Sequence, residues 1–318
     1  MFGYAQYFSR MDFDVRNRID DVSEFFQGDA IVWMKRDDLI HPHVSGNKWR
    51  KLKYNVHAAQ KKDHDTLITL GGAYSNHLAA TAAAASLHGM KSIGLIRGNY
   101  VDVNNPTLSF CRDQGMELFP LDIETYDLRH SEGFPTWVRD HIGSGFLIPE
   151  GGANYLGVNG CSEIVTELEE QPDLIVVPVG TGTTLAGIAM AAHGKCKVLG
   201  VQVLKGDGMV DDIQRLLLYT LGDNGFAQET IEQTVMLNRT FHFGGYARYQ
   251  DGLLDTMRAF YKITGIKTDP IYTGKMVAAV QQLLLQGKLD DFSKILMVHT
   301  GGLQGIRGFE QRYQLELF

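Results

Sequence analysis

The sequence is poor in cysteine and has no long apolar run. Its three cysteines, Cys111, Cys161 and Cys196, form no CxxC pair and no Cys/His cluster with metal-ligand spacing. We therefore expect reduced thiols and no metal site. Nothing approaches the roughly 20 consecutive apolar residues that a membrane helix needs, and residues 1–6 do not begin a basic region followed by an apolar run. These absences predict a cytoplasmic protein.

The sequence also lacks a basic excess, internal repeats and linkers rich in Pro, Gly or Ser. It has 30 Lys and Arg against 37 Asp and Glu, which gives a net charge of -7. This balance argues against a general nucleic-acid binder, so the expected partner is a small molecule. The 318 residues suffice for one or two domains, but composition does not place a boundary between them.

Short apolar runs alternate with longer helical patterns, which is typical of parallel strands joined by crossover helices. We therefore predict an α/β fold. Ligands of open parallel sheets bind beyond the carboxyl ends of the strands, so the turns after the strands are where we expect the chemistry. The expected strands are 30–35, 66–70, 92–96, 117–120, 174–178, 197–203 and 294–299. The expected helices are 48–61, 76–88, 106–114, 157–170, 184–193, 250–265 and 274–286.

The first chemical candidate is Lys48, in the segment SGNKWRK that follows the expected strand 30–35. A lysine that forms a Schiff base must present its amine to an aldehyde, so the adjacent Gly46 and Asn47 make chemical sense. Taken alone, a lysine at a helix start is more often an ordinary surface residue.

The second candidate is the segment GGAYSNH, residues 71–77, which leads into an alanine-rich helix. Ser75 and Asn76 stand at the start of that helix, where free amides favour an anion such as a substrate carboxylate. The same two residue types are also ordinary helix caps. Ser75 is in addition a candidate proton carrier or nucleophile.

The third candidate is the segment VPVGTGTTLAG, residues 177–187, whose successive amides and hydroxyls suit a phosphate. A dinucleotide site is less favoured, because Leu185 stands where that pattern needs its third glycine. Two tyrosines beside glycine turns, Tyr246 and Tyr272, are candidates for stacking on a ring or for donating a proton. Together with Lys48, the phosphate loop suggests a pyridoxal phosphate enzyme.

Five segments in this order, SGNKWRK, GGAYSNH, VGTGTTLAGI, DPIYTGK and HTGG, resemble the fold-type II pyridoxal phosphate enzymes, in particular D-cysteine desulfhydrase and 1-aminocyclopropane-1-carboxylate deaminase. The resemblance extends from about residue 30 to about residue 305. It implies a tryptophan synthase beta-like fold, with two open, twisted, mostly parallel sheets flanked by helices. It also implies a homodimer, a large cofactor domain made of residues 1–48 and 150–318, and a small inserted domain of residues 49–149.

The resemblance further implies a role for each site residue. Lys48 would bind the cofactor aldehyde and move the alpha proton, Asn76 would contact the ring hydroxyl, and Thr300 would face the pyridine nitrogen. The implied cofactor residues are Asn47, Lys48, Asn76, Gly180, Thr181, Gly182, Thr183, Thr184, Tyr272, Thr273 and Thr300. The implied substrate residues are Ser75, Asn76, His77 and Tyr246, and the implied catalytic residues are Lys48, Ser75, Tyr246 and Tyr272.

Thr273 departs from the deaminase pattern, which has Glu after the tyrosine of DPxYxGK. A hydroxyl cannot keep the pyridine nitrogen protonated as a carboxylate does, so the cofactor would be a weaker electron sink. This favours β-elimination from a D-cysteine-like substrate, giving pyruvate, ammonia and hydrogen sulfide, over the deamination of the cyclopropane substrate to 2-oxobutyrate and ammonia. Two remoter alternatives are a nucleotide-binding oxidoreductase, which gives Lys48 no role, and a catalytically silent relative that binds a ligand.

Overall fold

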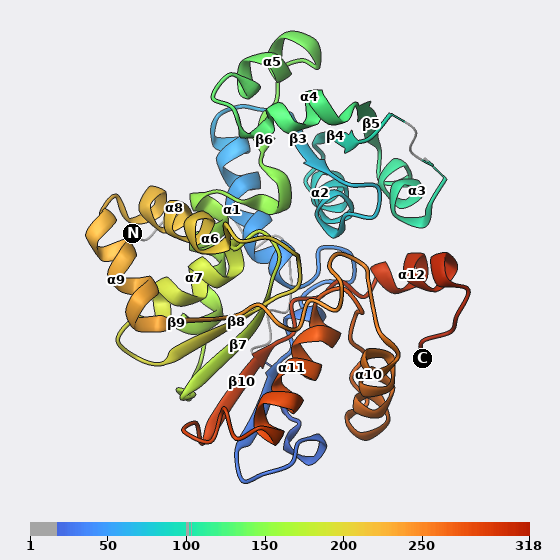
Figure 1. Ribbon diagram of the computed structural model, residues 1–318. Helices are drawn as coiled ribbons and strands as arrows, with labels where there is room; N and C mark the ends of the chain where they lie inside the picture. The colour runs from blue at the N-terminus through green and yellow to red at the C-terminus, as the bar shows by residue number, and fades with distance from the viewer. Residues whose placement is uncertain (1–17, 100–101, 103) are drawn as a thin grey trace.

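Two sheets form the frame of the protein in the computed structural model, which describes residues 18–99, 102 and 104–318 (Figure 1). The N-terminal segment 1–6, used above to predict the compartment, lies outside these residues. The larger sheet has the strand order β1-β2-β10-β7-β8-β9, and only its β1–β2 pair is antiparallel. The smaller sheet, β5-β4-β3-β6, is parallel throughout. The predicted α/β fold with two mostly parallel sheets is therefore confirmed.

The strands are β1 (Ile19–Asp21), β2 (Ile31–Lys35), β3 (Thr66–Gly71), β4 (Lys91–Arg97), β5 (Met116–Leu121), β6 (Phe146–Ile148), β7 (Leu174–Val179), β8 (Lys197–Gln202), β9 (Val235–Asn238) and β10 (Lys294–Val298). The helices are α1 (Asn47–Lys61), α2 (Asn76–Leu87), α3 (Pro106–Asp113), α4 (Ile123–Asp127), α5 (Phe134–His141), α6 (Tyr155–Thr166), α7 (Thr183–Ala192), α8 (Met209–Leu221), α9 (Asn224–Thr234), α10 (Asp251–Thr264), α11 (Thr273–Leu285) and α12 (Gly305–Tyr313). Within the described part of the chain, no helix is long and apolar enough to cross a membrane.

Both faces of the larger sheet are covered, which explains why its central strand β7 is apolar at every position. Successive side chains of a strand point to opposite faces. Leu174 and Val176 of β7 join a core cluster with residues of α10 and α11. Ile175 and Val177 join a second cluster with residues of α6 and α7. The turn that follows β7 is thereby held by packing on both sides of its strand.

The smaller sheet packs against α2, whose alanine run 79–85 is almost entirely buried. Short side chains let α2 lie close to its neighbours. One of its faces, with Ala80 and Ala84, shares a cluster with Leu52 and Val56 of α1. Another face, with Ala79 and Ala82, packs against residues of β4 and α3. The helix start at Asn76 is therefore fixed relative to α1.

The expected strands and helices are present with ends that shift by a few residues. The largest difference concerns the helix expected at 157–170, which spans Tyr155–Thr166 as α6. It begins early because the Asn154 side chain caps it by accepting from the Gly157 amide. It ends at Thr166, with Glu167 as its C-terminal cap residue. The elements β1, β6, β9, α4, α5, α8, α9 and α12 were not expected.

Candidate active site

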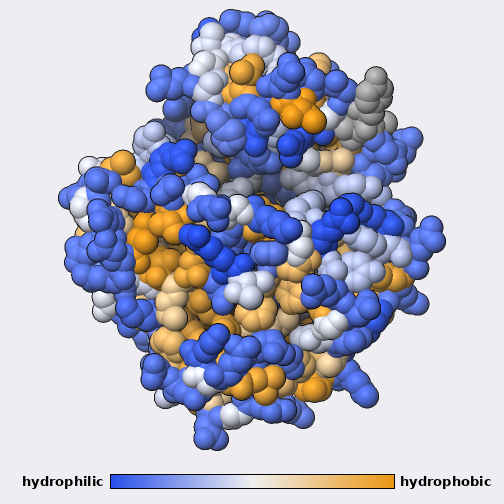
Figure 2. All heavy atoms as spheres, in the orientation of Figure 1, coloured by the Kyte–Doolittle hydropathy of each residue, from blue (hydrophilic) through white to orange (hydrophobic). Residues whose placement is uncertain are grey.

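A cavity of about 380 Å³ lies where the carboxyl ends of strands from both sheets meet. In the space-filling view, the surface is hollowed between the upper part, which carries α4 and α5, and the larger lower part (Figure 2). The cavity is lined by residues at or just after the ends of β3, β4, β7, β8 and β10. Its lining includes the expected residues Asn47, Lys48, Ser75, Asn76, His77, Gly180, Thr181, Gly182, Thr184, Tyr246, Tyr272 and Thr300. Thr183 and Thr273 are not among the lining residues.

Gly46 allows the helix that carries Lys48 to start against the turn after β10. It adopts a φ of +62°, and a Cβ at this position would lie 2.1 Å from the carbonyl oxygen of Thr300. The Asn47 amide donates a hydrogen bond of 3.3 Å to the same oxygen. Only glycine fits so close to another backbone segment, and this contact places Lys48 in the first turn of α1.

The Lys48 amine is hydrogen-bonded to its neighbour Asn47, and its pKa is lowered. Its Nζ donates to Asn47 Oδ1 over 2.8 Å, and Asn47 Nδ2 donates to Thr184 Oγ1 over 2.9 Å. Burial, together with the ammonium of Lys51, lowers the pKa of Lys48 from 10.5 to about 7. A large fraction of the amine is therefore neutral at neutral pH, as a nucleophile toward an aldehyde must be.

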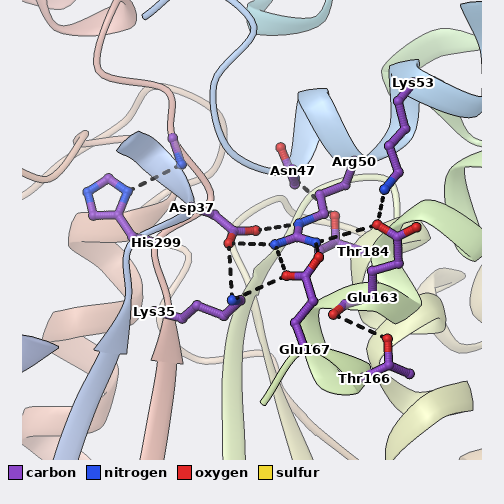
Figure 3. A network of polar contacts seen from close by, with 11 residues as sticks. Lys35, Asp37, Asn47, Arg50, Lys53, Glu163, Thr166, Glu167, Thr184 and His299 are labelled. Atoms are coloured by element: carbon purple, nitrogen blue, oxygen red, sulfur yellow. Dashed lines mark hydrogen bonds and ion pairs between the residues drawn. The ribbon is translucent and has the colours of Figure 1, made fainter. Parts of the chain in front are cut away.

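An ion network anchors α1 behind this lysine (Figure 3). The guanidinium of Arg50, which is 1% exposed, donates to both carboxylate oxygens of Asp37 over 2.9 and 3.0 Å. It also donates to both oxygens of Glu167, the residue that follows α6, over 2.7 Å each. Lys35 lies 3.5 Å from Glu167, and Lys53 pairs with Glu163 on α6. These ion pairs join α1 to the segment after β2 and to the end of α6, within two helical turns of Lys48.

The turn after β7 has the backbone features that a phosphate-binding turn needs. Gly182 adopts a left-handed conformation and caps the start of α7, where free amides concentrate positive potential. A Cβ on Gly180 would lie 3.2 Å from the Tyr272 ring, and one on Gly151 would lie 2.6 Å from the Thr181 side chain. The space above the turn therefore depends on these glycines. The Thr181 and Thr183 hydroxyls pair with each other at 3.1 Å.

The start of α2 combines helix capping with a place for an anion. Ser75 Oγ accepts from the amides of His77 and Leu78 over 3.2 and 3.3 Å, so Ser75 is the helix cap that its residue type suggests. The hydroxyl proton of Ser75 stays available to the cavity. His77 Nε2 pairs with Thr69 Oγ1 over 2.9 Å. Burial, with the charges of Lys48 and Lys51, holds the pKa of His77 well below 6.5, so this ring is neutral.

The two tyrosines are protonated phenols at neutral pH. Tyr246 is 45% exposed as a residue, but desolvation of its hydroxyl group and the nearby Asp269 raise its pKa to about 12. Burial and the neighbouring Tyr246 also raise the pKa of Tyr272 well above 10. The Tyr246 hydroxyl donates to the carbonyl oxygen of Tyr74 over 3.4 Å, across the cavity from its own loop. Phenols in this state can donate protons but cannot serve as bases.

Thr273 lies differently from its sequence neighbour Tyr272. It is fully buried, and its hydroxyl donates to Asp269 Oδ1 over 2.7 Å and accepts from the Asp269 amide over 2.8 Å. Both hydrogen-bonding functions of the hydroxyl are therefore engaged away from the cavity. Among the described lining residues, Glu150 is the one carboxylate, and it pairs with Arg129 at 3.0 Å.

Sequence reasoning assigned no role to several lining residues, among them Lys51, Tyr74, Arg97 and Glu150. Lys51 had a usable signal, since it stands one helical turn after Lys48, and its Nζ donates to the Gly151 carbonyl over 3.0 Å. Arg97 also had one, because it directly follows the predicted strand 92–96 and ends β4 in the structure. No three His, Cys, Asp or Glu side chains gather to hold a metal ion in residues 18–99, 102 and 104–318.

A neutral buried lysine, a glycine cradle at a helix start and hydroxyl partners around one cavity fit pyridoxal phosphate. Residues 17–301 match the family model described as pyridoxal-phosphate dependent enzyme. The chain belongs to this family of enzymes, and pyridoxal phosphate is its cofactor. The predicted fold type and cofactor are thereby confirmed.

Within the family, the chain is similar to two curated relatives. One is the 1-aminocyclopropane-1-carboxylate deaminase of Pseudomonas syringae pv. tomato, 28% identical over 91% of each chain. The other is the mitochondrial bifunctional D-cysteine desulfhydrase/1-aminocyclopropane-1-carboxylate deaminase of Arabidopsis thaliana, 30% identical over 86% of this chain and 73% of that protein. A solved structure described as an ACC deaminase homologue superimposes with a TM-score of 0.77, at 27% identity, over 94% of this chain and 93% of the other.

Proposed function

We propose that the protein is a D-cysteine desulfhydrase-type lyase, which converts a D-cysteine-like amino acid and water to pyruvate, ammonia and hydrogen sulfide. The coarser statement, a pyridoxal phosphate enzyme with relatives named as deaminases and a desulfhydrase, is given by the comparisons. The choice between the desulfhydrase reaction and the deaminase reaction depends on which leaving groups the site can expel.

The observation that carries this proposal is the position of Thr273. The deaminase pattern has a glutamate here, whereas this chain has a hydroxyl already engaged by Asp269. Asp269 in turn uses its carboxylate oxygens on the amides of residues 271–273 and on Thr273. This arrangement leaves hydroxyls such as that of Thr300 as the partners for a ring nitrogen. Without a carboxylate there, the site suits a substrate that loses a good leaving group.

When bound, pyridoxal phosphate supplies the electron sink that stabilises the negative charge left by removal of the alpha proton. In this proposal the Lys48 amine takes that proton, because it is the base with a pKa near neutrality. Tyr246 donates its phenolic proton to the departing sulfur. The start of α2, with the Ser75 hydroxyl and the Asn76 amide, binds the substrate carboxylate. Tyr272, whose ring lies beside Gly180, would pack against the cofactor.

The alternative is deamination of 1-aminocyclopropane-1-carboxylate to 2-oxobutyrate and ammonia. It is favoured by the names of the two relatives and by Ser75, whose hydroxyl lines the cavity as a candidate nucleophile or proton carrier. A ring that is hard to open needs a stronger electron sink, which is why we place this activity second.

The deciding experiment incubates the loaded enzyme separately with D-cysteine, L-cysteine and 1-aminocyclopropane-1-carboxylate and assays pyruvate and 2-oxobutyrate. We expect pyruvate from D-cysteine and none from the Lys48→Ala variant. Lys61→Ala, at the far end of the same helix, is the matched control and should keep the activity. Formation of 2-oxobutyrate at a higher kcat/KM than pyruvate would refute the assignment.

The same proposal includes the domain division at residues 48/49 and 149/150. It is supported by the smaller sheet, whose strands all lie between Thr66 and Ile148, while the strands of the larger sheet come from both sides of that range. The homodimer and the cytoplasmic location stay predictions.

A further inference from the structure

The loop that carries Tyr246 has an unusual backbone. Phe243, Gly244, Gly245 and Ala247 all have positive φ values, of +49°, +96°, +112° and +51°. Phe243 and Ala247 are two of the four residues other than glycine with this conformation in the described part of the chain. Side chains with a Cβ disfavour it, so the surrounding structure must hold the loop in place.

A buried ammonium provides that hold. Lys275, in the first turn of α11, has no exposed surface. Its Nζ donates to the carbonyl oxygens of His242 and Gly245 over 2.8 Å each, and to that of Val203 over 3.4 Å. The first two oxygens already accept the turn hydrogen bonds from the amides of Gly245 and Arg248. Lys275 therefore bonds to the second lone pair of each of these two turn carbonyls. Its bond to Val203 connects both turns to the residue that follows β8.

The same helix start carries Tyr272, three residues before Lys275. One element thus sets the position of both tyrosines, Tyr272 through the backbone and Tyr246 through the ammonium. On the far side of the loop, the Tyr313 hydroxyl donates to the Ala247 carbonyl over 2.9 Å. Tyr246 lies between these two ties, and its own hydroxyl bonds the Tyr74 carbonyl.

We infer that Lys275 is a positioning residue, which holds loop 242–247 in its left-handed conformation and so keeps the Tyr246 hydroxyl in the cavity. The part that concerns catalysis by Tyr246 rests on the proposed function, whereas the hold on the loop does not. An uncharged side chain of similar length cannot satisfy three carbonyls from two segments, so its loss frees the loop.

Hydrogen exchange of the loaded enzyme tests the hold without reference to activity. We expect Lys275→Met to speed exchange in peptides covering residues 241–248 by at least about tenfold, with α1 and β3 unchanged. Lys275→Gln, which keeps two donors, should give a smaller increase and is the second variant if the first folds poorly. The control is Arg258→Met, which removes a cation that donates to the carbonyls of Glu316 and Leu317 instead. If the loop exchanges in both Lys275 variants at the rate measured for the wild type, the inference is overturned.

A double-mutant cycle tests the link to Tyr246. Lys275→Met should lower kcat/KM by about tenfold or more in the wild-type background and by less than about threefold in a Tyr246→Phe background. Equal losses in both backgrounds would mean that Lys275 does not act through Tyr246. If no substrate is turned over at all, the proposed function fails, while the exchange result still decides whether Lys275 holds the loop.

Discussion

Lys48 and Thr184 are connected through a single side chain. Asn47 Oδ1 accepts from the Lys48 amine at 2.8 Å and its Nδ2 donates to the Thr184 hydroxyl at 2.9 Å, so one side-chain amide joins the start of α1 to the start of α7. The Lys48 amine and the loop after β7, to which we assign the aldehyde and the phosphate of the cofactor, are therefore kept at a fixed separation. Such preorganisation lowers the cost of binding.

Removing this connection should weaken cofactor binding. Asn47→Ala deletes two hydrogen bonds of about 1 kcal/mol each, so we expect the Kd for pyridoxal phosphate to rise by about 10- to 30-fold. Thr184→Val deletes one of them and should raise the Kd by about fivefold. Absorbance titration of the apoenzyme measures both. Unchanged affinity in both variants would show that the connection contributes nothing to binding.

The reactivity of Lys48 should depend on pH with a midpoint near neutrality. Its pKa is lowered, so the protonated amine dominates below about pH 7 and the neutral, reactive amine dominates above it. We expect the rate of cofactor uptake by the apoenzyme to rise nearly tenfold from pH 6 to 8 and then to level off. N-acetyl-lysine with pyridoxal phosphate, measured in parallel, should keep gaining rate to about pH 10. If the uptake rate of the apoenzyme instead keeps rising to about pH 10, as that of the free amine does, the pKa of Lys48 is not lowered.

The network around Arg50 should matter more for stability than its surface counterparts. Arg50→Met leaves the buried Asp37 and the partly buried Glu167 without their main partner, and we expect a loss of about 3 to 5 kcal/mol in the free energy of unfolding. The comparison is Lys91→Met, whose pair with Asp65 has 78% and 73% exposed side chains and should cost less than about 1 kcal/mol. Denaturant unfolding of the apoenzyme measures both. Similar losses for the two variants would contradict the anchoring role of Arg50.

Gly46 and Gly89 offer a matched pair of substitutions. Both have φ near +60°, but a Cβ on Gly46 would collide with the Thr300 carbonyl, while one on Gly89 would meet nothing within 4 Å. Gly89→Ala should therefore cost about 1 to 2 kcal/mol of stability and leave cofactor binding intact. Gly46→Ala should abolish uptake of pyridoxal phosphate, because α1 can no longer start against the turn after β10. Normal absorbance of the loaded Gly46→Ala variant would refute this.

Local sequence patterns predicted the parts of the fold that are determined locally. The buried strands and the alanine-rich helix α2 carry their own periodicity and propensity, so their positions were correct to a few residues. The short strands β1, β6 and β9 have three or four residues each and owe their existence to the strands beside them. Three or four residues are too few to show a strand periodicity of their own, which is why these strands were missed.

The site divides in the same way. The motifs around Lys48, Ser75 and Gly180 can be recognised in the sequence by glycines and hydroxyl residues next to strand ends. All three residues line the cavity. Thr273 shows the opposite case, because neighbouring residues at a helix start face different directions. Tyr272 lines the cavity while Thr273 turns to Asp269. The directions of these two side chains depend on how α11 packs, and the sequence motif does not contain that information.

The order of strands in the larger sheet has a consequence for how the protein is made. β10, near the end of the chain, lies between β2 and β7 and joins them in parallel. The smaller sheet is complete by Ile148 and can form while synthesis continues. The larger sheet remains divided until residue 298 has left the ribosome, and the turn that supports α1 follows it. A nascent chain therefore cannot complete the site for its cofactor before β10 and the turn after it have been made.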